Sequence, residues 1–225
     1  MQQLLLDILP SPLPTLENFQ PGRNIELLHM LTGIVSGREQ DRFVYLWGSP
    51  GSGKSHLLQA SVAAYTQSNR KAVYCCVQNG SEFVFDNGMD CIAIDDVDRL
   101  DPAGQIALFN LYNQLRDDGQ TFLLLSGAVA PMYLNLRQDL VTRLGWGLVF
   151  QVHELTEEEK IQAMKTHAAD RGFDISQEVC FYLLRHGRRD LPSLMMTLDT
   201  LDRYSLAQQR PITIPLLREL LQVTS

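Results

Sequence analysis

The sequence predicts an α/β protein, a five-stranded parallel sheet sandwiched by helices, followed by a small α-helical domain. Two observations support this fold class. From Arg42 onward, short apolar runs alternate with amphipathic helical patterns, and this alternation is typical of a parallel sheet that is buried on both faces. Beyond about Leu155 the remaining patterns are all helical. The 225 residues suffice for one substantial core and a small second domain.

The expected elements follow the apolar pattern in order. Strands are predicted at 43–47, 72–77, 91–94, 122–126 and 148–152, with helices at 56–68 and 103–118. Four more helices are predicted at 156–171, 176–187, 191–209 and 214–223. The first of these begins at Thr156, with Glu159 at the spacing of a capping box. We therefore expect a peptide and Pro-rich tether at 1–14, an α/β domain at 15–154 and a helical domain at 155–225.

Charge and composition exclude several classes of protein. The net charge of -7 argues against binding nucleic acid by generic phosphate neutralisation, and we expect no direct sequence-specific DNA binding. A cluster of Arg185, Arg188 and Arg189 is more typical of a solvated helix end. No apolar stretch approaches the roughly 20 residues of a membrane span, and the N-terminus lacks the pattern of a signal peptide. We expect a cytoplasmic protein without a membrane partner.

The cysteines and histidines favour neither disulfides nor a structural metal. The five histidines are scattered, and no Cys/His spacing suits zinc. None of the cysteines forms a CxxC pair, which favours reduced thiols in the cytoplasm. The cysteines are Cys75, Cys76, Cys91 and Cys180.

A glycine-rich loop predicts a phosphate site. GSPGSGKS, at 48–55, matches G-x-x-x-x-G-K-[ST] and lies between a predicted strand and a predicted helix. This context aims backbone N–H groups and a helix N-terminus at phosphate oxygens, and the alternative, a turn without a ligand, leaves the context unexplained. The residues expected to bind nucleotide here are Ser49, Pro50, Gly51, Ser52, Gly53, Lys54, Ser55 and His56.

A second motif predicts the acidic half of the same site. CIAIDDVD places Asp95 and Asp96 at the end of a buried strand, the Walker B arrangement of P-loop NTPases. We expect Asp95 and Ser55 to hold Mg²⁺, and Asp96 to orient the attacking water. Surface aspartates at a strand end are the alternative, which the upstream loop disfavours.

With these motifs, nearly the whole chain resembles the AAA+ superfamily of P-loop NTPases, and more narrowly its DnaA-related clade. ENFQPGRN, with Phe19, Gly22 and Asn24, resembles the box that wraps the adenine, and DLVTRLGWGLVF resembles the box that carries the arginine finger. The resemblance implies ADP or ATP with Mg²⁺ as ligand, a lid role for the helical domain, and Arg143 as the finger. Without it, a surface salt bridge would be the preferred reading of Arg143.

Two departures from the clade concern its phosphate sensors. Ala128 stands where relatives carry an acidic sensor 1 group, which leaves Ser126 as the nearby candidate. Pro192 stands where relatives carry the sensor 2 arginine, with Arg188 and Arg189 as possible substitutes. We expect weak intrinsic hydrolysis.

The first residues resemble the Q-L-x-L-x-[LI] peptides that dock on the sliding clamp, the beta subunit of DNA polymerase III. Gln3, Leu4, Leu6 and Ile8 are the candidate contacts, carried on a proline tether. A tail packed on its own domain is the alternative.

The chain ends without the helix-turn-helix domain of the initiator, and 77–90 is too short for the initiator's helical insertion. The resemblance then implies a regulator of replication initiation that stimulates ATP hydrolysis by DnaA, converting it to the inactive ADP form. The alternatives are a self-sufficient AAA+ ATPase and a DnaC-like helicase loader, and a homo-oligomer is possible. A small-molecule kinase would leave the helical domain and Arg143 without a role.

Overall fold

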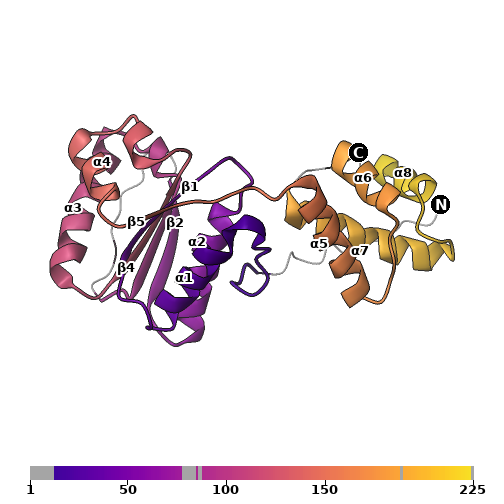
Figure 1. Ribbon diagram of the computed structural model, residues 1–225, viewed down its shortest axis with the longest axis horizontal. Coiled ribbons are helices and arrows are strands. Elements are labelled where there is room, and N and C mark those ends of the chain that lie inside the picture. Colours follow the sequence, from indigo (N-terminus) through magenta and orange to yellow (C-terminus); the bar gives the residue numbers. More distant parts are fainter. Residues whose placement is uncertain (1–12, 78–84, 86–87, 188–189, 224–225) are drawn as a thin grey trace. The chain divides into compact units, whose positions relative to one another are not determined.

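The protein forms two compact units that divide between Glu154 and Leu155 (Figure 1). The structure is a computed structural model, which describes residues 13–77, 85, 88–187 and 190–223. Within these ranges, no helix is long and apolar enough to cross a membrane. The two units are described separately.

The first unit is built on a five-stranded sheet in the order β2, β3, β4, β1, β5. All neighbouring strands are parallel, so one edge of the sheet holds every carboxyl end and the opposite edge every amino end. The expected parallel sheet is thus confirmed. The strands are β1 (Phe43–Trp47), β2 (Ala72–Cys76), β3 (Cys91–Asp95), β4 (Phe122–Gly127) and β5 (Leu148–Gln151).

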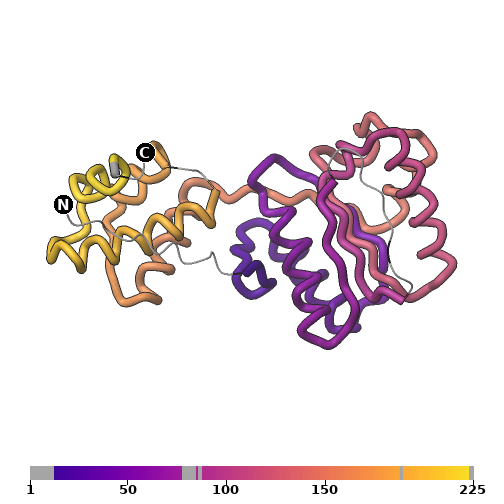
Figure 2. Tube along the Cα trace, turned by 180° about the vertical axis from the view of Figure 1, so that it is seen from behind, coloured from indigo at the N-terminus to yellow at the C-terminus, as the bar shows by residue number. Residues whose placement is uncertain are grey.

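Helices cover both faces of the sheet, as Figures 1 and 2 show. One face packs against α1 (Ile25–Val35) and α2 (Lys54–Gln67), and the other against α3 (Pro102–Asp118) and α4 (Gln138–Leu144). Because β3 and β4 are buried along their whole length, their sequences are continuous apolar runs rather than alternating ones. Short 3-10 turns at Gly22–Asn24 (η1), Val97–Arg99 (η2) and Pro131–Tyr133 (η3) complete the unit.

Helix α1 is an element that the sequence analysis did not assign. Leu27, Leu31 and Ile34 are buried in the core shared with α2. Their spacing of four and three residues is the signal that would have found the helix. The preceding Pro-rich stretch drew the interpretation toward an extended segment, which holds only up to η1.

The second unit is the expected helical domain. It contains α5 (Glu157–Asp170), α6 (Gln177–His186), α7 (Leu191–Gln208) and α8 (Ile214–Val223) around one apolar core. The predicted capping box is confirmed, because the Thr156 hydroxyl accepts from the Glu159 amide while the Glu159 carboxylate accepts from the Thr156 amide. Ser176 and Asp190 cap the next two helices with one bond each, since their side chains accept from the amides of Val179 and Ser193.

Candidate nucleotide-binding site

The phosphate loop leaves the carboxyl end of β1, and α2 begins directly after it at Lys54. Two of its glycines are required by close approach. A Cβ on Gly48 would lie 2.4 Å from the carbonyl oxygen of Val152. Gly53 has φ +102°, and a Cβ there would lie 2.7 Å from Cε2 of Phe19. The backbone therefore holds this loop in a shape that side chains would prevent.

Lys54 is a buried cation inside this loop. Its ammonium donates hydrogen bonds to the carbonyl oxygens of Gly48 (2.8 Å) and Ser49 (3.1 Å). Burial lowers the pKa of Lys54, and the nearby charges of Asp96, Asp95 and, more weakly, Asp98 oppose that shift. These two carbonyls are weak partners for an ammonium, so an anion at the loop mouth would be a better one.

Ser52 supplies a direct test of whether a phosphate fits. Its hydroxyl oxygen is buried and has no hydrogen-bond partner within the described residues. Buried polar atoms are rarely left unpaired, because the loss of hydration costs about 1–3 kcal/mol. A phosphate oxygen in the loop would satisfy this hydroxyl, so the residues present fit the nucleotide that the motif implies.

Asp95 lies at the end of β3 and is almost fully buried. The hydroxyl of Ser126, at the end of the neighbouring β4, donates to one carboxylate oxygen, and Tyr74 donates to the other at 2.8 Å. Burial raises the pKa of Tyr74, which keeps its hydroxyl protonated as the donor. Both oxygens of Asp95 are therefore engaged, an arrangement suited to contacting a metal through its bound water.

Asp96 turns the chain from β3 into η2 with φ 59°. Its amide donates to the Ser126 hydroxyl at 3.0 Å. Burial, and then the charge of Asp95, raises the pKa of Asp96, while Arg99 at 3.5 Å acts in the opposite direction. Asp96 is thus a partly exposed carboxylate with a weak counter-ion, beside the phosphate loop.

The predicted adenine segment folds back onto the same loop. Phe19 is buried with its ring 5.5 Å from that of His56, and His56 Nε2 lies 3.0 Å from the Thr15 carbonyl oxygen. Asn24 donates to the carbonyl of His153 (2.8 Å) and accepts from its amide (2.7 Å). Asn24 therefore joins the N-terminal segment to the end of the α/β domain.

The remaining loop residues follow this geometry. Gly22 opens η1 with φ 47°, and Gly51 has φ +82°. Ser55, the predicted metal ligand, is exposed in the first turn of α2. No group of three or more His, Cys, Asp or Glu side chains among the described residues is arranged to hold a metal unaided. A magnesium ion here would depend on phosphate oxygens and water.

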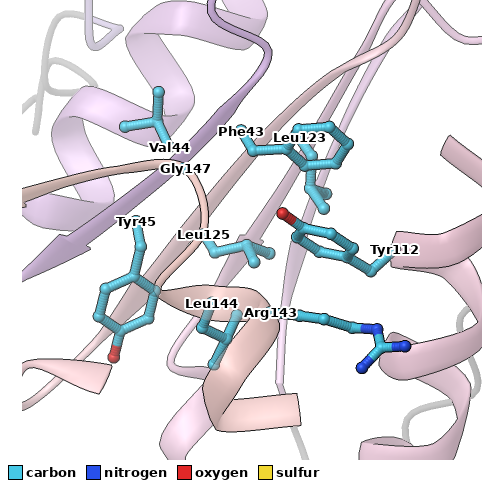
Figure 3. Close-up of a pocket in the computed structure, with 9 residues that line it drawn as sticks. All are labelled: Phe43, Val44, Tyr45, Tyr112, Leu123, Leu125, Arg143, Leu144 and Gly147. Carbon is cyan, nitrogen blue, oxygen red and sulfur yellow. The ribbon is translucent and has the colours of Figure 1, made fainter. Parts of the chain in front are cut away.

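Arg143 lies away from this cluster, in the last turn of α4. Its guanidinium donates to Asn113 Oδ1 at 2.9 Å and to the Asp139 carbonyl at 3.1 Å. It also lies 3.9 Å from the centre of the Phe109 ring and 5.3 Å from that of Trp146. Figure 3 shows its side chain among residues of β1, β4 and α3. An ordinary surface ion pair is thus not what holds Arg143.

Some predicted residues are not brought into the site. Gln3, Leu4, Leu6 and Ile8 lie outside the described residues, as do Arg188 and Arg189. Pro192 sits in the first turn of α7, where its missing N–H costs little.

Two residues near the phosphate site were missed by sequence reasoning. Tyr74 was counted only as part of an apolar strand, although its hydroxyl binds Asp95. For Asp98, the last residue of CIAIDDVD, the sequence predicts no role, yet its carboxylate accepts from the Ala128 amide at 3.1 Å. For Asp98, the third carboxylate in that short run was the available signal.

The parallel sheet with its glycine-rich loop after β1 and the following helical unit have the fold of AAA+ P-loop proteins. In a comparison with solved structures, domain III of the Thermotoga maritima DnaA matches with a TM-score of 0.74 and 21% identity, covering 94% of this chain and 96% of that one. The AMPPCP-bound DnaA from Aquifex aeolicus gives 0.69 and 22%, covering 85% and 65%. The Thermotoga maritima RuvB branch migration motor gives 0.67 and 17%, covering 95% and 72%.

The helical unit narrows this class further. Residues 157–221 match the family model described as the lid domain of Hda. The helical unit is therefore similar to the lid domain of Hda, and the chain shares the fold of DnaA domain III.

Proposed function

We propose that this protein binds an adenine nucleotide with Mg²⁺ and restrains replication initiation by supplying Arg143 to ATP held on DnaA. In this proposal the N-terminal peptide docks on the DNA polymerase III sliding clamp, and hydrolysis converts DnaA to its ADP form. The observation that carries it is the separation of Arg143 from the chain's own phosphate loop.

Nucleotide binding is supported by the loop itself. Lys54 is held inside the loop, the Ser52 hydroxyl lacks a partner within the described residues, and Asp95 is fixed behind them. The Aquifex aeolicus DnaA with the same fold binds AMPPCP. When bound, Mg²⁺ would neutralise phosphate charge, with Ser55 and water bound to Asp95 as its contacts from this chain.

The sheet register supports action in trans. β5 begins at Leu148, in register with Val44, so the chain leaving α4 arrives at the amino end of β1. The phosphate loop follows the carboxyl end of β1. About 13 Å of strand separates these two ends, from the rise of roughly 3.3 Å per residue. Arg143 is therefore poorly placed for its own nucleotide and better placed for that of a neighbouring molecule.

The alternative is a self-sufficient ATPase or a DnaC-like helicase loader. β4 ends at Gly127 and is followed by Ala128, and neither residue offers a polar side chain. Pro192 in α7 likewise offers no group to a phosphate. Rapid ATP turnover by the isolated protein would favour this alternative over a protein that supplies an arginine to DnaA.

The test uses DnaA loaded with radiolabelled ATP, sliding clamp on DNA, and the full-length protein. We expect the wild type to stimulate ADP formation on DnaA. An arginine finger typically contributes 10³–10⁵ in rate, so Arg143→Ala should abolish stimulation. Its matched control is Arg38→Ala, which removes the same charge from an exposed position after α1, on the opposite face of the sheet.

Each outcome bears on a different part of the proposal. Full stimulation by Arg143→Ala would contradict the arginine assignment. A wild type that never stimulates would contradict the regulatory function itself. Loss of stimulation in both arginine variants would indicate a general charge effect and not a finger.

Clamp docking is tested separately by pull-down with purified clamp. Alanine at Gln3, Leu4 and Leu6 should abolish capture by the clamp. The melting temperature should stay nearly unchanged, because a docking peptide binds in its partner's groove and does not pack in the core of its own protein. Leu13→Ala is the control, since this leucine follows the peptide and its tether in the sequence and is 81% exposed. A large fall in melting temperature would indicate that the peptide packs on its own protein.

A further inference from the structure

Side-chain hydrogen bonds join the end of β4 to the turn after β3. One side chain reaches from β4 to that turn, and another reaches from the turn to the residue that follows β4. Ser126, from β4, binds the Asp95 carboxylate and accepts from the Asp96 amide. Asp98, from η2, accepts from the Ala128 amide at 3.1 Å. The first contact holds the acidic strand end, whereas the second holds the segment that leaves β4.

The segment after β4 is held again one residue later. The Tyr45 hydroxyl donates to the carbonyl of Val129 at 2.9 Å. A Cβ on Gly127 would lie 2.1 Å from that hydroxyl and 3.3 Å from the Asp98 carboxylate. The space in which residue 127 would carry a side chain is thus filled by Tyr45 and Asp98. Their contacts fix the start of the segment.

Asp98 is also electrostatically linked to the phosphate loop. Asp98 lies in η2, directly after the Asp96 turn; its charge opposes the burial that lowers the pKa of Lys54 and adds to the rise in the pKa of Asp96. When a phosphate chain binds, Lys54 exchanges two neutral carbonyls for anionic oxygens. Each added phosphate brings negative charge, which repels the partly buried Asp98 carboxylate. The repulsion on Asp98 therefore depends on the number of phosphates bound.

The other end of the segment reaches the surface. Met132 and Tyr133, in η3, are 74% and 72% exposed. The residues that line a groove of about 460 Å³ include Ala130, Pro131 and Met132 of this segment and also Trp146. Trp146 therefore reports on this segment, and it also lies beside Arg143.

We propose that Asp98 is a positioning residue that makes the arrangement of Gly127–Tyr133 depend on which nucleotide is bound. This rests on the proposed nucleotide binding and adds to it a regulatory route from the phosphate loop to the Arg143 side of the protein. Asp98 senses the charge in the loop, and its bond to the Ala128 amide transmits the change.

The test measures two quantities on the full chain carrying Trp47→Phe, which leaves Trp146 as its one tryptophan. Calorimetry gives the affinities for ADP and for the triphosphate analogue AMPPCP, both with Mg²⁺. Acrylamide quenching of Trp146 gives its accessibility in the free and the two bound states. We expect quenching to differ between the ADP and AMPPCP complexes.

Two substitutions separate the charge of Asp98 from its hydrogen bond. Asp98→Asn keeps an oxygen that accepts from the Ala128 amide but loses the charge, whereas Asp98→Ala loses both. Both variants should lose the difference in Trp146 quenching, and both should change the ratio of AMPPCP to ADP affinity by about fivefold or more, since coupling is reciprocal. Without nucleotide, acrylamide should quench Trp146 equally in the Asp98→Asn variant and in the protein that keeps Asp98. The control is Asp117→Asn, an exposed carboxylate at the end of α3.

The outcomes are distinguishable. If the Asn variant keeps the wild-type quenching difference and affinity ratio, Asp98 is only a structural acceptor and the inference is overturned. Nucleotide binding with identical Trp146 quenching in both complexes would overturn the coupling alone. Absence of nucleotide binding would overturn the coupling together with the nucleotide part of the proposed function.

Discussion

The two edges of one parallel sheet position their candidate functional groups in different ways. At the carboxyl edge, Gly48, Ser52 and Lys54 belong to one short loop whose backbone positions them. At the amino edge, Arg143 depends on Asn113, thirty residues away along the chain, and on the face of Phe109. The candidate phosphate site is thus local in sequence, whereas the surroundings of the arginine are created by tertiary packing.

The two edges should therefore be separable by substitution. A change in the loop should weaken nucleotide binding, and a change around Arg143 should not. Both edges nevertheless depend on β1, which runs from one to the other and lies in the centre of the pairing with β4 and β5.

A large effect on stability is expected at Gly48. In Gly48→Ala the new methyl group would lie 2.4 Å from the Val152 carbonyl oxygen, so the chain leaving β5 must move. We expect a loss of about 3 kcal/mol in the free energy of unfolding, at the upper end of typical overpacking costs. Urea unfolding of the full chain measures it.

The matched control for Gly48 comes from the other edge. A Cβ on Gly145 would lie 3.6 Å from the Thr142 carbonyl, an ordinary contact, and its φ of -87° suits alanine. Gly145→Ala should change stability by less than about 1 kcal/mol. Equal losses in the two variants would contradict the difference drawn between these glycines.

The next effect is a loss of nucleotide affinity in Lys54→Ala. Hydrogen bonds to charged groups contribute about 1.5–3 kcal/mol, so the Kd for Mg·ADP should rise by about 10- to 150-fold. Calorimetry measures it, with the exposed Lys71→Ala as control. Because Lys54 loses only carbonyl contacts in the free protein, its fold should survive. Equal affinities in wild type and Lys54→Ala would show that Lys54 and its loop do not bind the nucleotide.

Much of the fold and the local part of the site could be predicted from the sequence. The continuous apolar runs of β3 and β4 and the G-x-x-x-x-G-K-S string carry their meaning within a few residues. The buried Lys54 and the Asp95 strand end appear in the structure where those strings place them.

The remainder depended on contacts between distant segments. The bond from Tyr74 to Asp95 follows from the pairing of β2 with β3, which periodicity does not specify. The Asp98 contact needs the end of β4 to lie against η2. Helix α1 had a usable apolar spacing, but the prolines before it dominated the interpretation.

A smaller effect is expected for Asn24→Ala. The substitution removes two hydrogen bonds to the backbone of His153, each worth about 1 kcal/mol net. We expect the free energy of unfolding to fall by about 1–2 kcal/mol, measured by urea unfolding without nucleotide. Asn110→Ala, at an exposed position in α3, is the control. An unchanged stability would show that Asn24 does not join the N-terminal segment to the end of this domain.

The smallest effect concerns the charge of Asp96. Burial and the charge of Asp95 raise the pKa of Asp96 in the folded protein, so its ionised form is less favourable there than in the unfolded chain. This penalty is present at neutral pH and disappears as the pH falls below the ordinary carboxyl pKa of 3.8, where both states are protonated.

Asp96→Asn keeps a residue type that tolerates the φ of 59°. The substitution should therefore raise the melting temperature of the nucleotide-free protein at pH 7. The gain in the free energy of unfolding should be less than about 1 kcal/mol, because Asp96 is partly exposed. The gain should shrink steadily as the pH is lowered toward 3.5, whereas Asp117→Asn, at an exposed position, should give a smaller change at pH 7. A melting temperature that falls at pH 7, or a gain of the same size at pH 3.5, would show that Asp96 does not carry an electrostatic penalty in the folded state.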